Sequence, residues 1–189
     1  MSTDAGPESG TRSRTRSAIL DAAASVLARD QAATVPDIAE AAGVGRTTIH
    51  RYFPDRETLI RATTWDSIQA LQLSVAEAQA EQGPPLEAMR RVVAAMVAVG
   101  DRLLFLFGDP SMLERTAGMQ MPTSDPVIDL IERGQAERAF DPEVSARWIQ
   151  HTLWALVYRG CLDASRGELP RHAIAPTVTR TLENGVRAR

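Results

Sequence analysis

The chain has 189 residues, of which 44% are hydrophobic and 24% charged, and its 21 basic and 24 acidic side chains give a formal net charge of −3. This balance excludes a disordered chain, and the length suits one large domain or a small domain joined to a larger one. A net negative charge also lacks the overall basic signature of a nucleic-acid-binding protein, so any such role has to rest on local charge.

The N-terminal part of the sequence predicts a disordered arm followed by a helix. Residues 1–12 are small, polar and rich in Gly, Ser and Thr, which is typical of a disordered segment. From Ser17 to about Arg29, apolar residues recur every three or four positions. This spacing predicts an amphipathic helix.

Two short helices are predicted next. Thr34 suits the N-cap of the first, and Asp37 lies where a capping-box acid would lie. Gly43 ends that helix after about two turns. The second is predicted over residues 46–52, because Pro54 cannot continue it.

The remaining sequence predicts longer helices. Asp55 is placed to cap a fourth helix that runs to the break at Gly83-Pro84-Pro85. The stretch 86–107 is apolar nearly all round, which predicts one helix at the centre of a bundle. Further helices are predicted at about 111–116, 126–139, 142–166 and 170–187. Because no segment alternates with period two, we expect an all-α fold of about nine helices, with a short-helix head and a long-helix body.

Several kinds of site are excluded or not expected. The single cysteine, Cys161, excludes an intrachain disulfide and a multi-cysteine zinc site. The three histidines (His50, His151, His172) lie far apart in sequence, so no metal and no cofactor is expected. The N-terminus has no secretory core, and the longest apolar run, residues 92–100, is far below the roughly 20 residues of a membrane span. We therefore expect a cytoplasmic protein.

The segment with the strongest functional signal lies between the two short helices and in the second of them. A turn at residues 41–45 contains Gly43, and a glycine in a tight turn between short helices is what a helix-turn-helix requires. The helix that follows reads RTTIHRYF, in which Ile49 and Phe53 are spaced to anchor it inward. Its other residues offer hydrogen-bond donors and no acid, as a recognition helix in the DNA major groove needs. Taken alone, the same pattern also suits a surface helix with a mixed polar face.

The wider segment TVPDIAEAAGVGRTTIHRYFPDRETLI, residues 34–60, resembles the DNA-binding head of the tetracycline-repressor (TetR/AcrR) family of bacterial transcription regulators. The resemblance covers roughly residues 15–61 and rests on fixed positions that recur in the family's motif. These are the pair Ile38 and Ala39, the turn Ala42-Gly43-Val44, the aromatic pair Tyr52 and Phe53, the basic Arg56 and Leu59.

The resemblance implies a DNA-binding site on the head. Arg46 and Thr47 are expected at base edges, and Arg51 at bases or phosphates. Thr34, Thr48, His50, Tyr52 and Arg56 are expected at phosphates. Three positions depart from the family's usual residues, because Gly45, His50 and Arg56 stand where serine, tyrosine and lysine are usual. These departures affect which operator sequence is recognised, and none of them removes the hydrogen-bonding chemistry of the motif.

The resemblance also implies a domain order and partners. Residues 13–54 would form the helix-turn-helix domain, and residues 55–189 a helical domain for effector binding and dimerisation. The expected partners are a palindromic double-stranded DNA operator, a second copy of the chain bound through the last two helices, and a small apolar effector that releases the DNA. Candidate effector-pocket residues are Trp65, Met89, Met96, Phe105, Met112, Met119, Trp148, His151, Thr152 and Tyr158.

We therefore expect a ligand-responsive regulator, with a repressor as the expected form, and not an enzyme. No nucleophile has a histidine partner suggested by spacing, and no glycine-rich phosphate loop follows a strand. The alternative is a helical small-molecule-binding or interaction protein without DNA binding. It would predict acidic or apolar replacements along the third helix, and Arg46, Arg51 and Arg56 argue against it.

Overall fold

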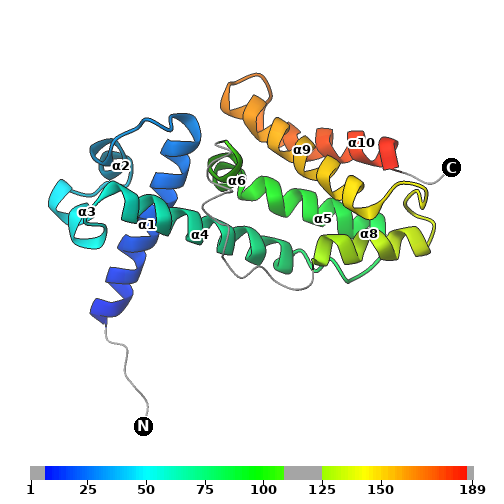
Figure 1. Cartoon of the computed structure of the whole chain (residues 1–189), viewed down its shortest axis with the longest axis horizontal. Coiled ribbons are helices and arrows are strands. Elements are labelled where there is room, and N and C mark those ends of the chain that lie inside the picture. The colour runs from blue at the N-terminus through cyan, green and yellow to red at the C-terminus, as the bar shows by residue number, and fades with distance from the viewer. Residues whose placement is uncertain (1–6, 109–124, 187–189) are drawn as a thin grey trace, which may run out of the picture. The chain divides into compact units, whose positions relative to one another are not determined.

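The computed structural model describes residues 7–108 and 125–186, and Figure 1 shows their helices. Within these ranges the chain has nine α-helices, one short 3₁₀ helix and no strand, which confirms the all-α prediction. It divides into two compact units, Met1–Ile68 and Gln69–Arg189, called the head and the body below. No helix in the described ranges is long and apolar enough to cross a membrane.

The head consists of three helices and the first part of a fourth: α1 Pro7–Arg29, α2 Val35–Ala41, α3 Arg46–Tyr52 and α4 Arg56–Glu77. Helix α2 packs against both α1 and α3. Their inward faces bury a small apolar core, which consists of Ile19, Leu20, Ala23, Ala24, Leu27, Ile38, Ala39, Ile49, Phe53 and Leu59. Burial of this core supplies the main driving force for folding helices too short to be stable alone.

Helix α1 begins earlier than the sequence predicted. Residues 7–12, which we expected in a disordered arm, are helical. Proline suits the first position of a helix because its fixed φ is already helical and its missing N–H has no partner there. The next turn adds local bonds, since Thr15 Oγ1 donates to the carbonyl of Thr11 at 3.0 Å. Apolar periodicity could not reveal this segment, because it contains no apolar stripe.

The body is a bundle of α5 Pro85–Ala98, α6 Gly100–Phe107, α8 Pro126–Ala136, α9 Ala146–Ser165 and α10 Ile174–Val186. A 3₁₀ turn, Arg171–Ala173, leads into α10. Helix α5 contacts α8, α9 and α10, so it is central to the bundle, as its apolar character predicted. Helix α9 also packs against α6, α8 and α10.

The single helix predicted over 86–107 is wrong, because the chain is interrupted at Val99, with φ −101° and ψ 24°. Glycine follows at position 100, where a Cβ atom would lie 2.7 Å from Cys161 Sγ. The break therefore brings the start of α6 close to α9, at a position where only glycine leaves room.

The helix predicted to start at residue 142 starts at 146 instead. Ser145 is its N-cap, and its Oγ accepts from the Trp148 N–H at 3.3 Å. Asp141 belongs to a turn in which its carboxylate accepts from the Glu143 N–H at 2.9 Å. Asp141 also donates its N–H to the carbonyl of Val186 at 2.8 Å. An aspartate before proline signals a turn as well as a helix start, and here the turn is formed. The helix predicted at 111–116 lies outside the described residues.

Candidate nucleic-acid interface and effector site

The turn between α2 and α3 is closed by backbone hydrogen bonds that require glycine. Gly43 has φ +65°, the left-handed conformation that glycine adopts without strain. Its N–H donates to Glu40 O at 3.0 Å, and the N–H of Val44 donates to Ala39 O at 2.9 Å. This pair of bonds is the Schellman motif, which ends α2 and reverses the chain. The predicted helix-turn-helix thus forms from interactions within six residues.

The N-terminus of α2 carries the predicted capping box. Thr34 Oγ1 accepts from the Asp37 N–H at 3.4 Å, and Asp37 Oδ2 accepts from the Thr34 N–H at 2.7 Å. The Thr34 hydroxyl also donates to Asp37 Oδ2 at 2.7 Å. These bonds, the side-chain bond from Thr34 first, lower the pKa of Asp37. The hydroxyl that we expected at a DNA phosphate is therefore used to build the end of α2.

Helix α3 separates its side chains into an inner and an outer face. Ile49 is fully buried, and Phe53, which follows the helix, is nearly so. Thr48 and Tyr52 are half-buried at the edges. The outer face is exposed and carries only donors and cations, namely Arg46, Thr47, His50 and Arg51. Helix α3 has no acid in its first turn and no side-chain cap at Gly45. This arrangement is suited to a negatively charged groove.

Two outer-face residues have local contacts that orient them. His50 Nδ1 lies 3.3 Å from the carbonyl of Pro54, and since a carbonyl only accepts, Nδ1 must carry the hydrogen in that contact. In the neutral ring Nε2 is then an acceptor, and it donates to a partner only when the ring carries a second hydrogen. The Arg51 guanidinium lies 5.6 Å from the centroid of the Tyr52 ring, within cation–π range.

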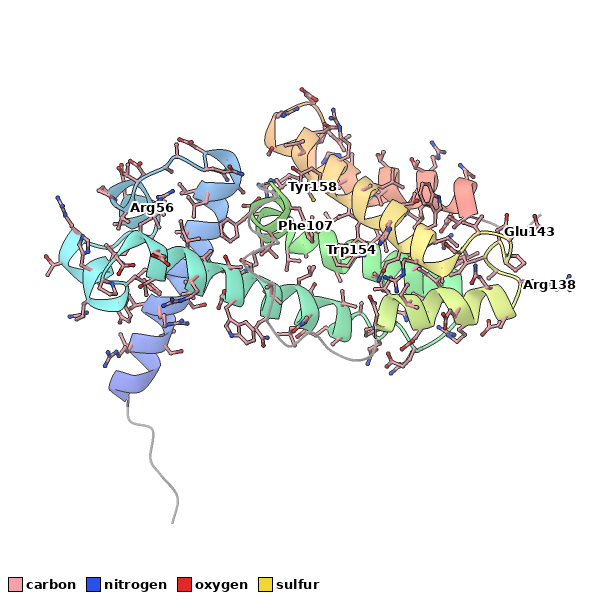
Figure 2. The ribbon with its side chains drawn as sticks, in the orientation of Figure 1. Arg56, Phe107, Arg138, Glu143, Trp154 and Tyr158 are labelled. Atoms are coloured by element: carbon pink, nitrogen blue, oxygen red, sulfur yellow. The ribbon has the colours of Figure 1, made fainter. Side chains whose placement is uncertain are left out.

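Arg56 has a different environment from the other predicted phosphate ligands. One of its terminal nitrogens donates to the carbonyl of Ala33, and Nη2 donates to the carbonyl of Gln31 at 2.7 Å. These contacts connect the first turn of α4 to the segment between α1 and α2 (Figure 2). The sequence identified the charge, but only the fold shows that it satisfies backbone carbonyls.

The predicted effector-pocket residues are spread over several environments. Met89, Met96 and Phe105 are buried in the body core. Thr152 and Tyr158 are half-buried on α9, where His151 is exposed and Trp148 is 66% exposed. Trp65, 46% exposed, belongs to the head. Met112 and Met119 lie outside the described residues.

A different set of residues is brought together on one face of α9. Gln150, Trp154 and Tyr158 are spaced by four, so they form one stripe along the helix. Trp154 meets Phe107, the last residue of α6, edge to face with ring centroids 5.9 Å apart. Figure 2 labels these three aromatic residues on α6 and α9.

The polar end of this stripe carries a carboxylate. The amide of Gln150, itself buried, donates to Asp125 Oδ2 at 2.5 Å. Asp125 also caps α8, since its Oδ1 accepts from the Val127 N–H at 3.0 Å. We call Phe107, Asp125, Gln150, Trp154 and Tyr158 the aromatic face. Of these, only Tyr158 is among the pocket residues predicted from the sequence, although the spacing of four along α9 also connects Tyr158 to Trp154 and Gln150.

A groove of about 520 Å³ lies elsewhere on the body, between α5 and α10. Arg90 and Glu183 form an ion pair there, with Nε and Oε1 2.6 Å apart. None of the predicted pocket residues lines it; the lining residues are Arg90, Ala175, Pro176, Thr179, Arg180, Glu183 and Asn184. This polar lining is a poor match for an apolar effector.

Comparisons with known proteins agree with the geometry of the head. The profile of a family described as "Bacterial regulatory proteins, tetR family" matches residues 19–63. The chain is 37% identical over 182 residues to the HTH-type transcriptional repressor LfrR of Mycolicibacterium smegmatis, covering 95% of this chain and 94% of that protein. It is 28% identical over 138 residues to the HTH-type transcriptional regulator NfxB of Pseudomonas aeruginosa, covering 71% and 73% of the two chains.

A solved structure shows that the similarity to LfrR extends over the whole fold. The crystal structure of LfrR from Mycobacterium smegmatis in complex with proflavine superposes with a TM-score of 0.76 and 34% identity, covering 95% of this chain and 99% of that one.

Proposed function

This chain belongs to the TetR family of bacterial regulatory proteins, and we propose that it represses transcription as a homodimer on a DNA operator and is released by a planar aromatic effector. Membership of this family makes the chain a DNA-binding transcriptional regulator. The proposal adds the dimer, the contact residues, the effector class and a location in the bacterial cytoplasm, where such a repressor meets its operator. The observation that carries it is the exposed outer face of α3, which has donors and cations and no acid.

The DNA contacts follow from which side chains are exposed. Arg46 and Thr47, at the start of α3, would read base edges, because arginine paired with guanine is the commonest specific contact in the major groove. Arg51 would bind phosphates, as would His50 when both of its ring nitrogens carry a hydrogen, with Thr48 and Tyr52 at the edge of the same surface. Arg56 would act as a positioning residue, since it fixes the segment before α2 through the carbonyls of Gln31 and Ala33.

A dimer is needed because one short helix reads only a few base pairs. Two heads related by a twofold axis read two half-sites about one helical turn, or a multiple of a turn, apart. We place the dimer contact on α9 and α10, on exposed residues such as Ala155. Gly160 serves another purpose, because a Cβ there would lie 2.8 Å from Ile174 Cγ2, so it lets α9 and α10 pack within one chain.

The effector class comes from the aromatic face together with the related structure. Proflavine, present in the LfrR crystal structure, is a planar aromatic cation. The aromatic face offers rings for stacking and edge contacts and one carboxylate, Asp125, for the positive charge. From Gln150 to Tyr158 the stripe extends about 12 Å, since an α-helix rises about 1.5 Å per residue. That length accommodates a ligand of three fused rings.

Proflavine fluorescence tests this proposal with a matched pair of variants. Trp154→Leu removes the ring that contacts Phe107, whereas Trp148→Leu removes an exposed tryptophan six residues earlier on the same helix. We expect Trp154→Leu to weaken proflavine binding about tenfold or more, because an aromatic contact contributes about 0.5–1.5 kcal/mol beyond the buried area that is also lost. Trp148→Leu should bind like the wild type. Equal effects of the two substitutions, or none, would contradict the assignment of the aromatic face.

A further inference from the structure

Residues 10–18 of α1 add no fully buried side chain to the core of the head. Residues 10–18 are all exposed except Thr15, which is half-buried, and the first fully buried residue of the helix is Ile19. The segment is also rich in Gly, Ser and Thr, which are poor helix formers. Neither burial nor helix propensity therefore accounts for a helix that starts at Pro7.

What distinguishes this segment is its charge. Arg12, Arg14 and Arg16 occur within five residues, and before Asp21 the only acid of α1 is Glu8. Arg12 and Arg16, spaced by four, lie on the same side of the helix, where like charges repel and destabilise an isolated helix. Arg14 points to another side, and its Nη2 donates to Thr11 Oγ1 at 3.2 Å. The spacing of Glu8, four residues before Arg12, offsets part of this repulsion, and a polyanion lying against the same side would offset the rest.

The Arg12 side of the helix is also the side that touches the recognition helix. The Arg16 guanidinium lies 5.7 Å from the centroid of the Phe53 ring, and Phe53 is the C-cap of α3. Arg12 lies one turn, about 6 Å, further toward the N-terminus than Arg16. In Figure 1 the first turns of α1 extend beyond the other helices of the head. Arg16 thus brings the basic segment of α1 to the C-terminal end of α3, the end at which Arg51 lies on the outer face.

We propose that the first turns of α1 are a second DNA-binding element, in which Arg12 binds a phosphate of the duplex beyond those bound by α3. This inference rests on the proposed DNA-binding function and adds to it a contact outside the helix-turn-helix. Duplex DNA is the occupant that the charge favours, because it presents phosphates at close, regular spacing beside any base that α3 reads. The contact carries no base specificity, so it strengthens binding and lengthens the region of backbone that each head covers.

The salt dependence of operator binding tests the inference. The probe is the duplex that the wild-type protein protects in DNA flanking its own gene, and the variants are Arg12→Gln and Arg14→Gln. Glutamine keeps a good helix former at each position while removing the charge. Each phosphate contact adds about 0.9 to the slope of log affinity against log salt concentration. With two heads per dimer, Arg12→Gln should reduce the slope by about 2 and weaken binding at low salt, while Arg14→Gln should change it much less.

The outcomes separate this inference from the function on which it rests. Arg138→Asn, in the body, serves as a second charge control, since Arg138 is exposed and its φ of +57° is one that asparagine accepts. If the wild type binds with a steep slope and Arg12→Gln matches it, the second element is refuted and the regulator function stands. If Arg12→Gln and Arg14→Gln have the same effect, the contact is not on the Arg12 side and the inference is also refuted. If the wild type protects no DNA, both fail.

Discussion

The head and the body each contain a glycine on which the local fold depends, but for different reasons. Gly43, in the head, has φ +65°, and a Cβ there would meet nothing within 4 Å. Gly134, in the body, is inside α8, and a Cβ there would lie 2.2 Å from the Phe140 ring. The first glycine is needed for its backbone conformation and the second for the space it leaves. The turn of the head is therefore shaped by backbone conformation, whereas the end of α8 in the body is shaped by the packing of a side chain.

The largest effect is expected from Gly134→Ala. The added methyl must displace the fully buried Phe140 ring, and overpacking of this kind costs about 1–3 kcal/mol or more. Chemical denaturation followed by tryptophan fluorescence should show a lower midpoint, with Trp148 and Trp154 reporting on the body. Gly43→Asn is the matched control, because asparagine accepts a positive φ and has open space there. A Gly134→Ala protein as stable as the wild type would show that the body is less tightly packed than we describe.

Arg46→Ala should weaken DNA binding by the head and leave effector binding by the body unchanged. It removes the expected base contact from the start of α3, so operator affinity should fall by about 1–3 kcal/mol and discrimination against altered bases should relax at one position in each half-site. Proflavine affinity should be unchanged, because the aromatic face belongs to the body. Electrophoretic mobility shifts with wild-type and single-base operators provide the measurement. A loss equal for every sequence would instead assign Arg46 to a phosphate.

Asp125→Asn tests the charge in the aromatic face without removing the helix cap. Asparagine caps helices as well as aspartate does, so α8 should remain intact. Affinity for cationic proflavine should fall several-fold, since an opposite charge at an exposed position contributes up to about 1 kcal/mol. Asp129→Asn, the same charge change one turn along α8, is the control. Equal losses in the two variants, measured by fluorescence titration, would mean that only general charge matters.

The smallest effect is expected from Thr34→Ala, which removes the capping box of α2 and should destabilise the head by about 1 kcal/mol. The effect should depend on pH. Since the Thr34 bonds lower the pKa of Asp37 in the folded protein, their stabilisation is complete above the ordinary value of 3.8 and disappears as the pH falls through the lowered pKa. Thermal unfolding at pH 7 and at pH 3 should therefore show a smaller difference between variant and wild type in acid. A difference that grows in acid would have the wrong sign.

A contrast between local and long-range interactions explains which features the sequence could predict. The bounds of α3 and the cap of α2 were predicted because their determinants, Thr34, Asp37 and Gly43, lie within the turns that they control. The aromatic face was mostly missed, because Phe107 and Asp125 meet α9 only after the bundle has formed.

Two further features that the sequence did not predict also depend on contacts between residues distant in sequence. The break before Gly100 depends on its closeness to Cys161, a residue on another helix. Arg56 was recognised as a cation, but its carbonyl partners, Gln31 and Ala33, are more than 20 residues away in sequence. Periodicity and capping rules describe single helices, so contacts between helices lie beyond them.

The central claim is that the head binds duplex DNA through α3 although the whole chain is acidic. Footprinting the purified protein on DNA flanking its own gene, over a series of salt concentrations, tests this claim most directly. The account predicts two protected half-sites related by a twofold axis, with an affinity that falls steeply as salt rises. No protection at low salt would contradict it.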